Sequence, residues 1–276
     1  MPDRMSLAMI RSRLAFLGLG LLVSFLLYLL LPAIQQESSS FSGELNPPRL
    51  SVAEAHVEAR AGPPQSNVSL RTGKTAGDSP TFYIEAVPMN KAAGPKADRI
   101  DVLLLHGQSF TSKTWQDLGT LSLLAENGYR AVALDLPGYG MSLESKAKAS
   151  DQGRVDYILR IIETLGLKEP ILVSPSMSGM FSLPLVLQHG EHLKGFVPIA
   201  PVGTKGYSAE QYQRVQTPTL IVYGERDTNL GTQSLENLRQ IPKHTIAMLA
   251  NAKHACYLDQ PRHFHQALLG FLNSLK

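Results

Sequence analysis

Hydrophobic positions along most of this chain follow two kinds of spacing. Short apolar runs, such as 100–105 and 171–173, alternate with longer segments in which apolar residues recur every three or four positions, as in 154–165. The runs are typical of buried parallel strands, and the longer segments are typical of helices that cover them. The pattern predicts strands at 82–87, 100–105, 130–134, 171–173, 195–199, 219–223 and 245–249, and helices at 115–126, 154–165, 179–189, 233–239 and 264–275.

This alternation identifies the fold class. Strands separated by helical segments indicate an α/β protein with a mostly parallel, doubly wound sheet and helices on both faces. In such folds, ligands bind beyond the carboxyl ends of the strands. The residues that come after each predicted strand are therefore the first place to look for chemistry.

An apolar stretch near the amino terminus predicts a membrane anchor. Residues Leu14 to Leu31 carry no charge, and three arginines precede them. This length spans a bilayer as a helix, which favours a retained signal anchor over 14–34 rather than a cleaved signal peptide. By the positive-inside rule, residues 1–13 form a cytosolic tail and the chain is a single-pass type II protein with a lumenal or extracellular catalytic domain. A cytoplasm-facing domain and secretion after cleavage are the alternatives.

Residues 35–80 differ in composition from the rest of the chain. They are rich in Ser, Pro, Gly and Gln without a sustained hydrophobic period, which predicts a flexible stalk. The stalk contains the triplet Asn67-Val68-Ser69, and Asn67 would be a glycosylation site in a lumenal segment. The composition changes at Thr81, so the folded domain is predicted at 81–276.

Composition excludes several classes of function. The net charge of +3 comes without a dense basic patch, so no nucleic-acid partner is expected. The single cysteine, Cys256, excludes an internal disulfide and a thiolate metal cluster. Five histidines fall on predicted helices or strand edges with no recognisable ligand spacing, and no metal site is predicted; they are His189, His192, His244, His263 and His265.

The segment around Ser176 predicts a catalytic nucleophile. The strand at 171–173 stops at small residues, and a helix-compatible segment begins at Gly179. A strand, a sharp turn and a helix in this order hold the apex side chain above the sheet in a strained backbone conformation, the geometry of a nucleophile elbow. Serines 174 and 178 stand where the usual Gly-x-Ser-x-Gly pattern has glycines.

Asp227 and His254 complete a serine nucleophile. Both come after predicted strands, and the chain order Ser, Asp, His is typical of such folds. A serine hydroxyl needs an adjacent base, so His254 would accept its proton while Asp227 orients the imidazole. His106, which also comes after a strand, is expected to hold its own loop together by hydrogen bonding.

Two backbone N–H groups are predicted to stabilise the oxyanion of the tetrahedral intermediate. One belongs to Met177, directly after the nucleophile, and the other to Gln108 in the loop His106-Gly107-Gln108. Glycine at 107 lets the backbone approach the reacting atoms closely.

Several motifs cover almost the whole predicted domain: Leu-Leu-Leu-His-Gly, Thr-Trp-Gln-Asp-Leu-Gly-Thr-Leu, Asp-Leu-Pro-Gly-Tyr-Gly, Val-Ser-Pro-Ser-Met-Ser-Gly, Phe-Val-Pro-Ile-Ala-Pro and His-Ala-Cys-Tyr-Leu. These motifs resemble those of the α/β-hydrolase domain-containing protein 14 family, and the anchor resembles that of its A-type branch. The resemblance implies an α/β-hydrolase fold with nucleophile Ser176, acid Asp227 and base His254. It also implies that protein-lysine deacetylation with transfer of acetyl to coenzyme A, the chemistry of the B-type branch, is possible.

These observations predict a membrane-anchored serine hydrolase that needs no cofactor. It would cleave an ester, thioester or amide of a small-molecule or protein-borne acyl substrate through an acyl-enzyme. The connection between Pro201 and Thr217 is too short for a cap domain, which leaves the site open and favours small acyl groups. The alternatives are an acyltransferase or protein-lysine deacetylase that uses coenzyme A as acceptor, and a non-catalytic interaction module on a hydrolase scaffold.

Overall fold

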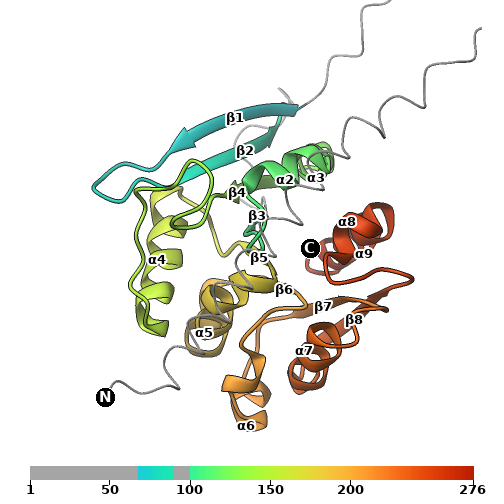
Figure 1. The fold of residues 1–276 in the computed structure, drawn as a ribbon. Helices are drawn as coiled ribbons and strands as arrows, with labels where there is room; N and C mark the ends of the chain where they lie inside the picture. The colour runs from blue at the N-terminus through green and yellow to red at the C-terminus, as the bar shows by residue number, and fades with distance from the viewer. Residues whose placement is uncertain (1–67, 90–99) are drawn as a thin grey trace, which may run out of the picture. The chain divides into compact units, whose positions relative to one another are not determined.

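The computed structural model describes residues 68–89 and 100–276, which form one eight-stranded sheet (Figure 1). The strand order is β1-β2-β4-β3-β5-β6-β7-β8. Strands β3 to β8 are mutually parallel, while β1 and β2 run antiparallel to their neighbours. The predicted mostly parallel, doubly wound α/β architecture is confirmed.

The element boundaries agree closely with the hydrophobic pattern. The strands are β1 (Val68–Lys74), β2 (Phe82–Pro88), β3 (Asp101–Leu104), β4 (Arg130–Leu134), β5 (Ile171–Pro175), β6 (Gly195–Ile199), β7 (Thr219–Gly224) and β8 (His244–Leu249). The α-helices are α2 (Ser112–Asp117), α3 (Thr120–Glu126), α4 (Asp151–Thr164), α5 (Gly179–His189), α6 (Ala209–Gln213), α7 (Leu230–Leu238), α8 (Cys256–Asp259) and α9 (Pro261–Ser274). Short 3-10 turns are η1 (Ser176–Ser178), η2 (Gly190–His192) and η3 (Thr204–Gly206).

Two apolar layers sandwich the sheet, and side chains of a single strand alternate between them. Val102 and Leu104 of β3 belong to one layer, which also receives α2, α3, α8 and α9. Leu103 and Leu105 belong to the other layer, with α4, α5, α6 and α7 (Figure 1). Because both faces of the central strands are buried, these strands are apolar at consecutive positions rather than at alternate ones.

The amino-terminal limit of the folded domain differs from the prediction. Strand β1 covers Val68–Lys74 and pairs antiparallel with β2 over its whole length, although composition predicts a flexible stalk throughout residues 35–80. Its sequence has only two apolar side chains, Val68 and Leu70, of which Leu70 is exposed, so the strand shows no sustained hydrophobic period and is held mainly by backbone pairing. The predicted domain start at Thr81 is therefore wrong.

The predicted helix at 115–126 is two helices. Gly119 lies between α2 and α3 with a φ of 77°, in the left-handed region that glycine enters without steric cost. The apolar spacing continues across this break because both short helices bury their residues in the same layer. Periodicity alone therefore does not reveal the break.

The predicted single-pass type II topology with a lumenal or extracellular domain is corrected here. Among the helices of residues 68–89 and 100–276, none is long and apolar enough to cross a bilayer. The longest, α4 and α9, have 14 residues each, against the roughly 20 that a spanning helix needs. The stretch Leu14–Leu31 and Asn67, the predicted glycosylation site, lie outside the described residues.

Little covers the carboxyl edge of the sheet between β6 and β7. The connection contains only η3 and the five-residue helix α6, which is capped at its start by Ser208 and Gln211. The expectation of little or no cap domain is therefore confirmed in the described part of the chain.

Trp115 connects the end of β3 to two helices. Its side chain is fully buried, and its ring stacks on Tyr257 with a centroid distance of 4.9 Å. The indole Nε1–H donates a hydrogen bond of 2.7 Å to the carbonyl oxygen of Leu105. Leu105 directly precedes the loop that carries His106, so this bond helps to hold the loop in place.

Replacing Trp115 by Phe should lower the free energy of unfolding by about 1–3 kcal/mol, because the Leu105 carbonyl loses its donor while it stays buried. The measurement is urea unfolding followed by far-UV circular dichroism, since the substitution removes the single tryptophan. Lys113→Ala on the same helix is the control, because its ion pair with Asp117 is exposed and should contribute little. Equal urea midpoints for Trp115→Phe and the wild type would contradict this role.

Candidate active site

Ser176 lies on a strained turn at the carboxyl end of β5. Its φ is +50°, in the left-handed region that non-glycine residues rarely occupy. The carbonyl oxygen of Ser176 accepts a 2.9 Å hydrogen bond from the N–H of Val202, in the loop after β6. A Cβ on Gly179 would stand 2.6 Å from the Val202 carbonyl oxygen, so only glycine permits this close approach. The predicted elbow geometry is present at this position.

Hydrogen bonds between buried hydroxyl groups hold the residues on both sides of this turn. Ser174 Oγ donates to Ser182 Oγ at 2.6 Å, and Ser178 Oγ donates to the carbonyl oxygen of Pro175 at 2.7 Å. All three serine side chains are completely buried. These contacts explain how serines replace the usual glycines on both sides of Ser176, since each buried hydroxyl has a partner.

The structure brings the side chains of Ser176, His254 and Asp227 into one line. His254 Nε2 lies 2.8 Å from Ser176 Oγ, and His254 Nδ1 lies 2.6 Å from Asp227 Oδ2. With the proton on Nδ1, the imidazole donates to the carboxylate and accepts from the serine hydroxyl. Asp227 is buried, while the His254 side chain is 41% exposed, so the imidazole is accessible from solvent.

Contacts between two loops set the position of Asp227 relative to His254. The N–H of Arg226 donates to the Ala252 carbonyl oxygen at 2.8 Å, and the Arg226 guanidinium donates to Asn251 Oδ1 at 2.6 Å. A Cβ on Gly224 would stand 2.2 Å from the Lys253 carbonyl oxygen, which makes glycine necessary there. Arg226 therefore joins the loop after β7 to the loop after β8.

The loop after β3 forms another wall of the site. Gln108 and Ser176 line the same cavity of about 210 Å³, together with His254. A Cβ on Gly107 would lie only 3.6 Å from the Cβ of Ser176, so this loop passes directly beside the hydroxyl. Met177 comes directly after Ser176, at the start of the segment that continues into α5. Of the two residues predicted to supply oxyanion donors, Gln108 thus shares a cavity with Ser176 and Met177 is its neighbour in the chain.

The rest of the cavity wall is largely apolar. Phe110, Ile199 and Tyr257 contribute their side chains to it. A larger cavity of about 350 Å³ lies near the end of α5, but none of the three predicted catalytic residues lines it. The smaller cavity is the relevant one, because it contains the serine and the histidine.

His106 has the structural role predicted for it. Its Nδ1–H donates to the Gly107 carbonyl oxygen at 2.8 Å, and its Nε2 accepts from the N–H of Leu136 at 2.9 Å. Burial lowers the pKa of His106, because a charged ring would lose its hydration. The neutral ring thereby joins the loop after β3 to the loop after β4.

Cys256 lies two residues after His254, but its thiol is buried. Burial raises the pKa of Cys256 to about 12. The thiol therefore stays protonated at neutral pH and is a poor nucleophile, since the thiolate is the reactive form.

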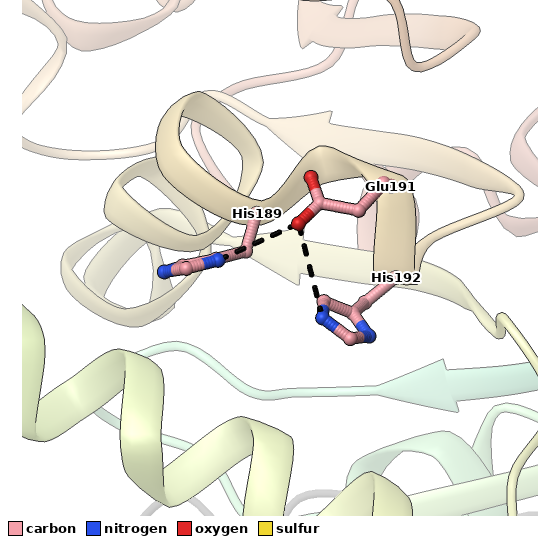
Figure 2. Close-up of side chains that lie close together, drawn as sticks. All are labelled: His189, Glu191 and His192. Atoms are coloured by element: carbon pink, nitrogen blue, oxygen red, sulfur yellow. Dashed lines mark ion pairs between the residues drawn. The ribbon is translucent and has the colours of Figure 1, made fainter.

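One cluster of potential metal ligands was missed from the sequence. Side chains of His189, Glu191 and His192 converge at the end of α5 (Figure 2). The signal is a short sequence, His-Gly-Glu-His, across the end of a helix. The three residues do not have the spacing of ligands on one helix face, because the helix ends at His189 and the 3-10 turn η2 follows.

Comparison with known proteins gives strong matches. Residues 102–207 match the family model described as alpha/beta hydrolase fold. The chain is 53% identical to Protein ABHD14A of Danio rerio, covering 96% of this chain and 98% of that protein. It is also 46% identical to the human Putative protein-lysine deacylase ABHD14B, covering 71% of this chain and 91% of that protein.

Solved structures share the fold at low sequence identity. A predicted CIB-like hydrolase from Thermoplasma acidophilum superimposes with a TM-score of 0.67 at 21% identity, covering 75% of this chain and 99% of that chain. Carboxylesterase CesB from Bacillus subtilis gives a TM-score of 0.62 at 18% identity, covering 74% and 92% respectively. At such identities, the likeness concerns the fold alone.

The free energy of unfolding should fall as the pH drops from 7.5 to 5.5. The folded-state pKa of His106 is lower than its unfolded value of about 6.5, so the unfolded state binds more protons in the window between the two values. The contribution of the neutral His106 ring to the free energy of unfolding is complete above about pH 6.5 and is lost as the pH falls below that value. The measurement is urea unfolding at several pH values.

Burial also lowers the pKa of His265, so the contribution of His265 to the pH dependence must be separated from that of His106. The variant His265→Gln removes its contribution while leaving His106 in place. This variant should still lose stability toward pH 5.5. A stability that does not change with pH in His265→Gln would show that His106 does not resist protonation.

Proposed function

We propose that this chain, which belongs to the ABHD14A family of α/β-hydrolase fold proteins, is a serine hydrolase. It would work through an acyl-enzyme on Ser176. One observation carries the proposal. His254 stands between the Ser176 hydroxyl, at 2.8 Å, and the buried Asp227 carboxylate, at 2.6 Å. The left-handed turn under Ser176 and the adjoining cavity support the same interpretation.

In the acylation step, Ser176 Oγ attacks the carbonyl carbon of the substrate while His254 Nε2 takes the hydroxyl proton. Asp227 accepts the Nδ1–H bond and stabilises the imidazolium that forms. The carbonyl oxygen becomes an oxyanion, which we assign to the backbone N–H groups of Met177 and Gln108. Collapse of this intermediate breaks the bond to the leaving group, which takes the proton from His254.

In the deacylation step, water replaces the leaving group. His254 removes a proton from the water as its oxygen attacks the acyl-enzyme carbonyl. The second tetrahedral intermediate collapses to the free acid, and the proton returns to Ser176 Oγ. The exposed side of His254 gives water direct access to this position.

The cavity favours a short acyl group. Its volume of about 210 Å³ is below the roughly 300–1,000 Å³ of sites that enclose drug-sized ligands. Phe110, Ile199 and Tyr257 provide an apolar surface for a few methylene groups. Because only η3 and α6 connect β6 to β7, a large leaving group can extend into solvent. We therefore propose short-chain acyl esters, thioesters or amides as substrates.

The name of the ABHD14B relatives suggests a specific amide. These proteins are described as putative protein-lysine deacylases, so an acylated lysine side chain is a candidate substrate for this chain as well. The acyl group could pass to water or to a thiol acceptor such as coenzyme A. Product analysis separates the two routes, since the first yields a free acid and the second an acyl-thioester.

Replacing Ser176 by Ala should abolish labelling by a fluorophosphonate probe and reduce kcat for an acetyl ester by at least about 10⁴-fold, because it removes the hydroxyl that lies 2.8 Å from His254 Nε2. Gel fluorescence and ester hydrolysis are the measurements. Ser274→Ala, in the last turn of α9, is the matched control and should label like the wild type. Equal labelling of Ser176→Ala and the wild type would refute the assignment.

Turnover should fall with acyl length. We expect acetyl to butyryl esters to have a higher kcat/KM than an octanoyl ester, because the longer chain does not fit beside Phe110. Phe110→Ala should raise the octanoyl-to-acetyl ratio of kcat/KM by enlarging the cavity, and the ratio corrects for any general loss of activity. A wild-type enzyme that prefers octanoyl over acetyl would contradict the short-acyl assignment.

A further inference from the structure

A second cluster of reactive side chains lies at the opposite end of α5 from Ser176. His189 ends the helix, and Glu191 and His192 come next, in the turn η2. Figure 2 shows the Glu191 carboxylate between the two imidazole rings. One oxygen, Oε1, lies 3.5 Å from His189 Nδ1 and 3.8 Å from His192 Nε2. Three potential ligand atoms therefore point into a common space.

The backbone that carries these side chains is held in place. The Gly190 carbonyl oxygen accepts hydrogen bonds from Thr217 Oγ1 at 3.0 Å and from the N–H of Leu193 at 3.1 Å. A Cβ on Gly190 would stand 2.5 Å from Thr217 Oγ1, so glycine is needed for this contact. Leu193 is buried and leads into β6. Because the backbone of this turn is already fixed, the three side chains lose less conformational entropy on binding one ion than they would on a flexible loop.

The donor set matches a transition metal. Two imidazole nitrogens and one carboxylate oxygen leave a fourth position for water, a combination that Zn²⁺ accepts in tetrahedral geometry. With metal bonds of about 2.1 Å, tetrahedral donors stand about 3.4 Å apart. All three donor atoms here lie within 4.8 Å of one another. Small rotations of exposed side chains would bring them to bonding distance.

The location also favours a cation. The carbonyl groups at the end of the 11-residue helix α5 place partial negative charge beside His189. The side chains of the cluster are 36% to 68% exposed, so the two His–Glu contacts by themselves contribute little to stability. Exposure also gives an ion direct access from solvent.

We propose that His189, Glu191 and His192 form a surface site for a divalent transition metal, with Zn²⁺ as the best match. Helix α5 is about 16 Å long and Ser176 precedes its other end, in η1, so the bound ion would take no part in acyl transfer. The ion would instead join the end of α5 to the turn that leads into β6. Because it binds the folded form, it would stabilise the protein against unfolding.

The test is calorimetric titration of the full-length, chelator-treated protein with zinc chloride. The wild type should bind one more equivalent of zinc than the double variant His189→Ala, His192→Ala, and zinc should raise its melting temperature. Glu191→Gln should bind at least about tenfold more weakly, because a neutral amide replaces the carboxylate ligand. His263→Ala, which removes an exposed histidine of α9, is the matched control and should bind like the wild type.

Cobalt provides a second readout. Co²⁺ in place of zinc should give the visible absorption bands of tetrahedral coordination in the wild type and not in the double variant. Circular dichroism checks that each variant is folded, and Glu191→Gln keeps the test valid if the double variant is not. Equal zinc stoichiometry and affinity in the wild type and in folded variants, or the absence of zinc binding to the wild type at millimolar concentration, would overturn the proposal. Acetyl-ester turnover should be unchanged in the variants.

Discussion

The left-handed backbone at Ser176 is the constraint around which the site is built. A non-glycine residue in this conformation costs on the order of 1–2 kcal/mol, so the surrounding structure must hold it there. Gly179 allows the loop after β6 to approach, and the N–H of Val202 bonds the Ser176 carbonyl oxygen. The buried serine hydroxyls fix the strand below. If the turn relaxed, the hydroxyl would no longer face His254.

The fold and the candidate chemistry were predictable for related reasons. Burial on both faces makes strands such as β5 apolar at consecutive positions, and the helices that cover them keep a regular period. Parallel strands bring all of their carboxyl ends to one edge of the sheet, and this predicts that Ser176, Asp227 and His254 meet there. The three side chains do lie together there, with His254 within hydrogen-bonding distance of both of the others.

Other features depend on contacts that a local pattern does not contain. Strand β1 exists because its backbone pairs with β2, and Arg226 joins two loops through Asn251, a residue 25 positions away. The division between α2 and α3 requires the φ of Gly119, which sequence spacing does not encode. The grouping of His189, Glu191 and His192 arises where a helix changes into a 3-10 turn. In each case, three-dimensional geometry decides the outcome.

The early position of β1 has a practical consequence for anyone who shortens this protein. A chain that begins at Thr81 would lose the partner that β2 has along its whole length. The backbone N–H and C=O groups on that side of β2 would become an open sheet edge, available for pairing with another molecule. Such a truncated domain would be prone to aggregate although it still contains Ser176, Asp227 and His254. Retaining the residues from Val68 onward keeps the edge covered.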